Sequence, residues 1–253
     1  MKEAYIIDGI RTPIGSFGGT LAAVRTDDLA AHAIRELVVR NPSLDLESIA
    51  DVIIGCANQA GEDNRNVARM ASLLAGLPFS VPAETVNRLC ASGMNAAAHA
   101  FRAIRNDDGD VFISGGVENM TRGPYVMSKP TRAYGTDSKM YDSSFGWRFV
   151  NPIMFELYGT DAMGETAENL VEKFGISREA QDKFAFWSQM KAAKAQENGR
   201  LAMEIAAVSI PQRKKDPIIF EKDEFVKVGQ GVRFEVALFF SVAHLLRWEQ
   251  TLE

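Results

Sequence analysis

The first part of the chain alternates short apolar runs with stretches of helical periodicity. The apolar runs predict buried strands at residues 4–10, 51–55, 84–87 and 110–114. Apolar side chains recur every three or four positions at about residues 26–39, 64–75 and 90–106, which predicts helices there. Strands and helices that alternate with short connections are typical of an α/β fold with a mostly parallel sheet.

The pattern weakens after Glu118. Residues 119–162 are rich in Met, Pro, Gly, Tyr and Thr, which predicts an inserted loop region of the kind that often carries binding sites. Two helices are expected next, and two short strands follow them. The helices are predicted at about residues 165–174 and 178–198, the second capped by Ser177, and the strands at 205–210 and 218–220.

This change in composition and periodicity, together with the apolar C-terminal stretch, divides the chain into three parts. Residues 1–118 are predicted to form an α/β domain, residues 119–228 a loop domain with returning strands, and residues 229–253 an atypical tail. The apolar run at residues 236–246 in that tail is too short to span a bilayer. A core helix and a helix lying on a surface both fit it.

Composition and charge argue against some classes of partner. The 253 residues are 46% hydrophobic and 24% charged, with a net charge of -5 and no basic stripe, so nucleic acid is not expected as a partner. The charged N-terminus lacks the apolar stretch of a signal peptide, and no membrane association is expected. The two cysteines form no disulfide framework. These features together predict a cytoplasmic globular protein.

Cys90 is the strongest candidate for chemistry because it stands where a predicted strand ends and a helix begins. A helix N-terminus favours the thiolate, which is the nucleophilic form of cysteine. The small residues Ala91, Ser92 and Gly93 leave room for a substrate. A free cysteine can also be a small buried hydrophobe, and that interpretation suits Cys56 at the end of a buried strand. For Cys90 the setting favours the nucleophile.

Four ordered segments resemble motifs of the thiolase family. They are residues 8–15, the nucleophile segment 87–93, the Gly-Gly-Val-Glu-Asn-Met-Thr segment 115–121 and the Met-Gly-Glu-Thr-Ala-Glu-Asn segment 163–169. The resemblance covers about residues 1–228. It implies a layered α/β/α fold, with the N-terminal half and the loop domain on the CoA-binding side present and the second half absent.

The resemblance also implies roles for three residues. Cys90 would carry the acyl group as a thioester, and Met163 would line the pantetheine channel. Lys227 falls where the family usually has an arginine near the nucleotide end of CoA. Core packing is an equal alternative for Met163, and a solvated surface lysine is the favoured alternative for Lys227.

Two further segments, residues 56–69 and 146–152, are similar to the β-ketoadipyl-CoA thiolases of aromatic-compound catabolism. That subgroup implies cleavage of 3-oxoadipyl-CoA by CoA to succinyl-CoA and acetyl-CoA. CoA and acyl-CoA would be substrates, with no separate cofactor and no metal, and the family implies a homo-oligomer. An acetoacetyl-CoA thiolase is the alternative within the family.

The sequence departs from the family in its second half. The Gly-His-Pro histidine that serves as base and the Cys-x-Gly-Gly cysteine that serves as acid do not occur, and none of His32, His99 and His244 precedes a proline. We expect a truncated or frame-shifted product or a short paralogue. Losing a general acid or base costs about 10²–10⁴ in rate, so turnover is expected near zero.

Two other functions stay open on these grounds. One is a non-catalytic remnant of a thiolase. The other is a condensing ketoacyl synthase, against which the segment at residues 163–169 argues. Without a second half, one face of the central helical layer is expected to be bare and apolar.

Overall fold

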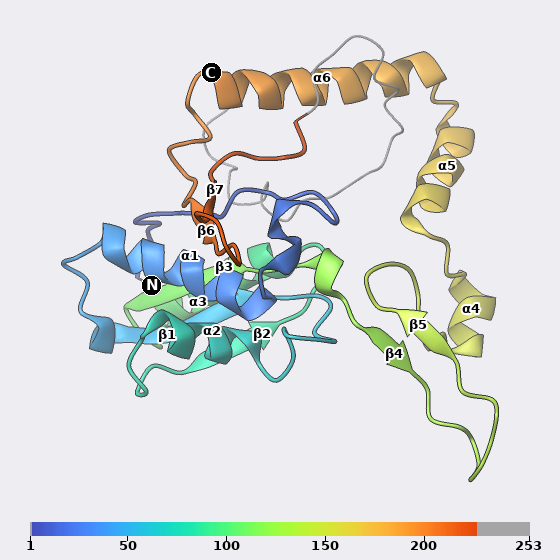
Figure 1. Cartoon of the computed structure of the whole chain (residues 1–253), viewed down its shortest axis with the longest axis horizontal. Helices are drawn as coiled ribbons and strands as arrows, with labels where there is room; N and C mark the ends of the chain where they lie inside the picture. The colour runs from blue at the N-terminus through green and yellow to red at the C-terminus, as the bar shows by residue number, and fades with distance from the viewer. Residues whose placement is uncertain (1, 227–253) are drawn as a thin grey trace. The chain divides into compact units, whose positions relative to one another are not determined.

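The computed structural model describes residues 2–226 and divides them into two compact units (Figure 1). The first unit contains residues 2–123 and 204–224, and the second contains residues 124–203 and 225–226. The domain division predicted at residues 118 and 228 stays a prediction. Lys227 and the tail at residues 229–253 lie outside the described residues.

A three-stranded parallel sheet forms the centre of the first unit, with the strand order β2-β1-β3. The strands are β1 (Ile49–Gly55), β2 (Ala83–Val86) and β3 (Val111–Gly116). The helices of this unit are α1 (Thr26–Arg40), α2 (Val67–Ala75) and α3 (Ser92–Asn106), with short 3₁₀ turns η1 (Thr20–Ala23), η2 (Leu46–Ser48) and η3 (Met120–Arg122). All three strands therefore end at the same edge of the sheet.

Side chains of β1 alternate between the two faces of the sheet. Val52 and Ile54 belong to the core that contains residues of α1 and α2, whereas Ile53 packs with Ala96 and Ala100 of α3. The sheet thus has α1 and α2 on one face and α3 on the other. This arrangement confirms the predicted layered α/β fold.

The predicted N-terminal strand at residues 4–10 is wrong. The segment has no strand pairing among residues 2–226, and Ile6 is 89% exposed. Its anchors are polar instead, because Arg40 and Asn41 donate hydrogen bonds to Asp8. An apolar run forms a strand only when a neighbouring backbone pairs with it, and the described part of the chain offers none.

Hydrogen bonds with residues 204–224 hold the loop that follows the N-terminal residues. The strands of this segment, β6 (Val208–Ile210) and β7 (Ile218–Phe220), pair antiparallel, so β6 is shorter than the predicted strand at 205–210. The mostly buried Asp223 carboxylate accepts two hydrogen bonds from the Arg11 guanidinium at 2.7 and 2.9 Å. It also accepts one from the Ile14 N–H at 2.8 Å.

The second unit contains more regular structure than the sequence predicted. Its elements are the antiparallel pair β4 (Tyr125–Met127) and β5 (Met140–Asp142), and the helices α4 (Pro152–Tyr158), α5 (Met163–Phe174) and α6 (Arg178–Glu197). The expectation of an irregular region over 119–162 missed α4. Asn151 caps this helix by accepting the Ile153 N–H, and Pro152 suits its first turn.

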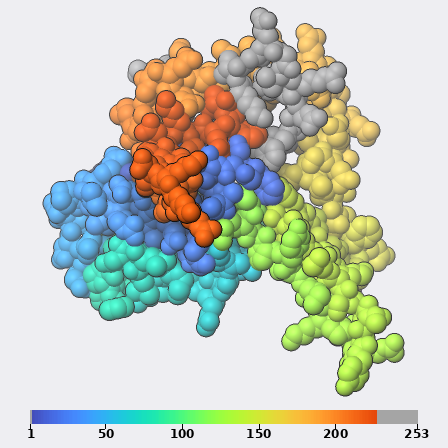
Figure 2. Space-filling model, viewed as in Figure 1, coloured from blue at the N-terminus to red at the C-terminus, as the bar shows by residue number. Residues whose placement is uncertain are grey.

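The predicted Ser177 cap and the predicted helix ends at residues 75 and 174 are confirmed. The Ser177 hydroxyl accepts the Ala180 N–H at the start of α6, while Gly76 and Gly175 end α2 and α5 with positive φ. Most of the second unit, coloured from yellow-green to light orange in Figure 2, is exposed. Among residues 2–226, no helix combines the length and the apolar character that crossing a membrane requires.

Candidate active site

Cys90 lies on the turn between β2 and α3, and its side chain is exposed. Helix α3 begins at Ser92, so the predicted helix start at residue 90 is two residues too early. The turn follows the carboxyl end of a parallel strand, which is where open α/β sheets place their ligands. The thiol is therefore accessible at the edge of the sheet where open α/β sheets bind their ligands.

The backbone of this turn is unusual at Leu89, whose φ of 51° lies in the left-handed region. The Asn87 side-chain oxygen accepts the Leu89 N–H at 2.9 Å. The Ser92 hydroxyl accepts the Arg88 N–H at 2.8 Å and donates to the Leu89 carbonyl at 2.6 Å. Both polar groups of the Leu89 backbone are thus bonded to side chains within the turn.

Gly55 at the end of β1 lets α3 approach the sheet. A Cβ at this position would lie 2.3 Å from the Ser92 carbonyl carbon and 2.4 Å from the Gly93 nitrogen. These distances are far shorter than any van der Waals contact, so only glycine fits. The first turn of α3, next to Cys90, is consequently held against the backbone of β1.

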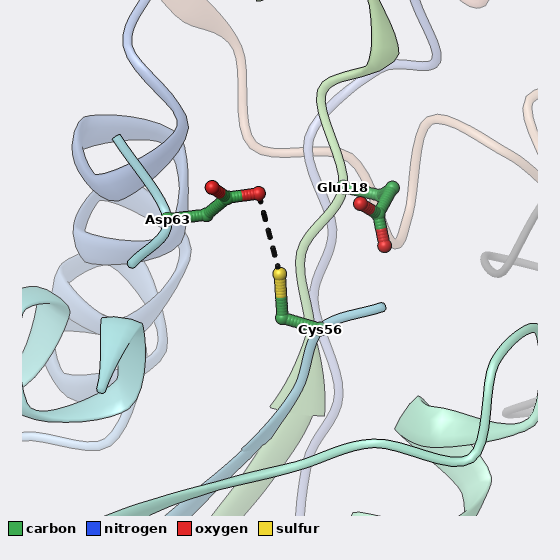
Figure 3. Close-up of side chains that lie close together, drawn as sticks. All are labelled: Cys56, Asp63 and Glu118. Carbon is green, nitrogen blue, oxygen red and sulfur yellow. Dashed lines mark hydrogen bonds between the residues drawn. The ribbon is translucent and has the colours of Figure 1, made fainter. Parts of the chain in front are cut away.

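Cys56, Asp63 and Glu118 lie close together beside the loop that follows β1, with the Cys56 thiol donating to the Asp63 carboxylate at 3.6 Å (Figure 3). Burial and the two neighbouring carboxylates raise the pKa of the Cys56 thiol to about 12. A protonated thiol is a poor metal ligand. Burial also raises the pKa of Glu118, although two backbone N–H donors oppose that shift.

The two carboxylates have backbone partners in this loop. Glu118 accepts the N–H groups of Ala57 and Asn58 at 2.9 and 3.1 Å, and Asp63 accepts those of Gln59 and Gly61. Loop capping therefore accounts for the cluster. Sequence reasoning did not single out these carboxylates, because nothing in their local sequence indicates which loop they cap.

The loop after β1 is also joined to the turn that carries Cys90. The Asn87 side-chain N–H donates to the Ala57 carbonyl at 3.0 Å, and the Ala57 N–H donates to Glu118. Asn87 follows β2, Ala57 follows β1 and Glu118 follows β3. Hydrogen bonds thus connect the carboxyl ends of all three strands around the candidate nucleophile.

His99 and Met163 lie outside the turn that carries Cys90. His99 lies on α3, 3.4 Å from the Glu84 carboxylate, and beside a cavity of about 410 Å³ that Cys90 does not line. Met163 is the first residue of α5 and is 56% exposed, but it belongs to the second unit. The roles predicted for Cys90 and Met163 remain predictions.

The parallel sheet, the helices on its two faces and an exposed cysteine at a strand-to-helix turn define the class of the protein, which is α/β. Residues 4–232 match the family model described as "Thiolase, N-terminal domain", so the chain belongs to that family. The assignment made from the four sequence motifs is confirmed.

Individual relatives agree with this assignment. A β-ketoadipyl-CoA thiolase of Escherichia coli is 58% identical over 227 residues, which are 90% of this chain and 57% of that protein. A β-ketoadipyl-CoA thiolase of Acinetobacter baylyi is 56% identical over 224 residues, 88% of this chain and 56% of the relative. The crystal structure of the Bacillus anthracis acetyl-CoA acetyltransferase matches with a TM-score of 0.74 and 32% identity, covering 94% of this chain and 56% of that one. The chain thus spans little more than half the length of these relatives.

Proposed function

We propose that Cys90 is the acyl-accepting nucleophile of a thiolase-type acyl-CoA acyltransferase. The observation that carries this proposal is the exposed thiol on a tightly bonded turn, at the edge of the sheet where all three strands end. Membership of the thiolase family supports it independently.

The chemistry has two steps. In the first, the Cys90 sulfur adds to the keto carbon of a 3-oxoacyl-CoA, and the bond from that carbon to the adjoining CH₂ breaks. Acetyl-CoA leaves as its enolate and takes up a proton, while the acyl group remains on sulfur as a thioester. In the second, the thiol of CoA adds to the thioester and releases the shortened acyl-CoA. The Cys90 backbone N–H is our candidate for stabilising the oxyanion.

We propose 3-oxoadipyl-CoA as the substrate, since the similar proteins of E. coli and A. baylyi are named β-ketoadipyl-CoA thiolases. In this proposal Met163, Lys227 and the loop domain at residues 119–228 belong to the CoA-binding side. A cytoplasmic homo-oligomer completes the proposal. Because the 253 residues contain no Gly-His-Pro or Cys-x-Gly-Gly motif, we expect acylation of Cys90 without sustained turnover.

Trapping the acyl-enzyme tests this proposal. The purified chain is incubated with 3-oxoadipyl-CoA, acetoacetyl-CoA or succinyl-CoA, and the acylated peptide is identified by mass spectrometry. Succinyl-CoA is the most direct probe, because thioester exchange with Cys90 requires no enolate to be protonated. We expect hydroxylamine-sensitive acylation at Cys90, which Cys90→Ala removes and Cys56→Ser retains.

The alternatives predict different results. A non-catalytic protein would show no acylation of a Cys90 that still reacts with iodoacetamide, and this result would refute the proposal. Faster labelling by acetoacetyl-CoA than by 3-oxoadipyl-CoA would reject the proposed substrate while keeping the nucleophile.

A further inference from the structure

The turn that carries Cys90 contains a leucine in a conformation that favours glycine. Leu89 has a φ of 51°, and an L-residue with a bulky side chain takes up that conformation only when its surroundings impose it. Such residues cluster at functional sites. Its N–H donates to the Asn87 side chain at 2.9 Å, which closes a local turn of the kind that asparagine forms with the residue two positions later.

We propose that Asn87 is a positioning residue, which holds Leu89 in the left-handed conformation and thereby places the Cys90 thiol at the start of α3. This inference rests on the proposed role of Cys90 as the nucleophile. Asn87 acts through the backbone of its neighbour and does not itself take part in the chemistry.

The Asn87 amide is held in one orientation. Its oxygen faces the Leu89 N–H and its nitrogen faces the Ala57 carbonyl at 3.0 Å, so turning the amide over would break both hydrogen bonds. Ala57 is in turn held by Glu118, which accepts the Ala57 N–H at 2.9 Å. The orientation of Asn87 is therefore supported from outside the turn.

Asn87 is a better experimental target than Ser92, the other side chain that bonds the Leu89 backbone. Ser92 is only 3% exposed and lies in the first turn of α3, against Gly55. Changing it would disturb the start of the helix. Asn87 is exposed, so its replacement removes two hydrogen bonds and little packing.

The test measures the rate constant for alkylation of Cys90 by iodoacetamide at pH 7, followed by peptide mass spectrometry. Cys56 is 1% exposed, and its protection reports in the same sample that the protein is folded. We expect Asn87→Ala to slow alkylation of Cys90 about tenfold, because the turn relaxes and no longer holds the thiol in one position.

A double variant separates positioning from general support of the structure. Glycine takes up positive φ readily, so Leu89→Gly alone should leave the rate near that of the parent. Combined with Asn87→Ala, it should recover about threefold or more of the lost rate. A role of Asn87 limited to holding the Ala57 loop predicts no recovery, and absence of recovery would overturn the proposal.

Asn87→Ser provides a second arm that keeps an oxygen for the Leu89 N–H and lacks the donor to Ala57. We expect its rate to stay within about threefold of the parent. If Asn87→Ala proves unfolded, with Cys56 reactive, this variant decides the question, and a tenfold loss would count against the proposal. Alkylation needs no CoA. If acylation by acyl-CoA fails while these alkylation results hold, the acyl-transfer role falls and the positioning of Cys90 stands.

Discussion

Replacing Gly55 by alanine should push the first turn of α3 away from the sheet. The added Cβ would lie 2.3 Å from the Ser92 carbonyl carbon, 2.4 Å from the Gly93 nitrogen and 2.5 Å from the Ser92 oxygen. Ordinary contact begins near 3.4 Å, so the two backbones must separate by about 1 Å. All three atoms are backbone, and no side-chain rotation can relieve the clash.

The size of the effect follows from this overlap. Overpacking a core costs about 1–3 kcal/mol, and a clash with backbone on both sides belongs at the upper end, about 2–3 kcal/mol. For a chain of this length each kcal/mol lowers Tm by about 2–4 °C. We therefore expect Gly55→Ala to lower Tm by about 4–12 °C in thermal unfolding followed by circular dichroism.

Gly115→Ala is the matched control, because Gly115 lies on the adjoining strand β3, opposite Ile54 of β1. A Cβ there would meet only the Ile54 Cδ1 atom at 3.9 Å, an ordinary contact. Its Tm should stay within about 3 °C of the parent. Equal losses in the two variants would refute the steric argument, as would an unchanged Tm and an unchanged alkylation rate of Cys90 in Gly55→Ala.

Three further predictions concern the thiols and two ion pairs. Ellman's reagent should react with Cys90 in the native protein and with Cys56 only after denaturation, because burial and nearby carboxylates raise the pKa of the Cys56 thiol to about 12. Rapid reaction of both thiols in the native protein would contradict this prediction. Asp223→Ala should lower the free energy of unfolding in urea by about 1–3 kcal/mol, since it removes the bidentate partner of Arg11, whose guanidinium keeps its ion pair with Glu204 at 2.8 Å. A loss below about 1 kcal/mol would show that solvent replaces the pair. Hydrogen bonds from Arg122 lower the pKa of Glu62, so its contribution to stability is present above the ordinary value of 4.5 and disappears as pH falls through the lowered pKa. Glu62→Gln should therefore make Tm less dependent on pH below about 4.5, and an unchanged dependence would assign the acid sensitivity to other groups.

Local signals in the sequence predicted α1, α2, α3, α5 and α6, although α4 was missed. Ser177 caps α6, and Gly76 and Gly175 end their helices because positive φ is easily reached by glycine. Each of these interactions joins residues within a few positions of one another. The neighbouring sequence therefore determines where these helices begin and end, independently of the rest of the fold.

Strand predictions depend on partners that lie far away along the chain. Residues 51–55 were predicted as a strand and form most of β1, since β2 and β3 pair with it on both sides. Residues 4–10 have an equally apolar pattern but remain exposed and unpaired within the described part of the chain. Apolar alternation predicts the capacity to form a strand, and the pairing decides whether one forms.

The candidate site depends both on local sequence signals and on contacts between distant segments of the chain. Cys90 was found from the local sequence because a strand and a helix meet there, but its surroundings were not. Asn87 reaches Ala57 across 30 positions of sequence, and Ala57 reaches Glu118 across 61. The parallel register brings these residues to one edge of the sheet, and the same register sets the close contact of Gly55 with α3. The reactivity of Cys90 is therefore expected to depend on residues from three strand ends, and variants at Gly55 and Asn87 should alter it without touching the thiol.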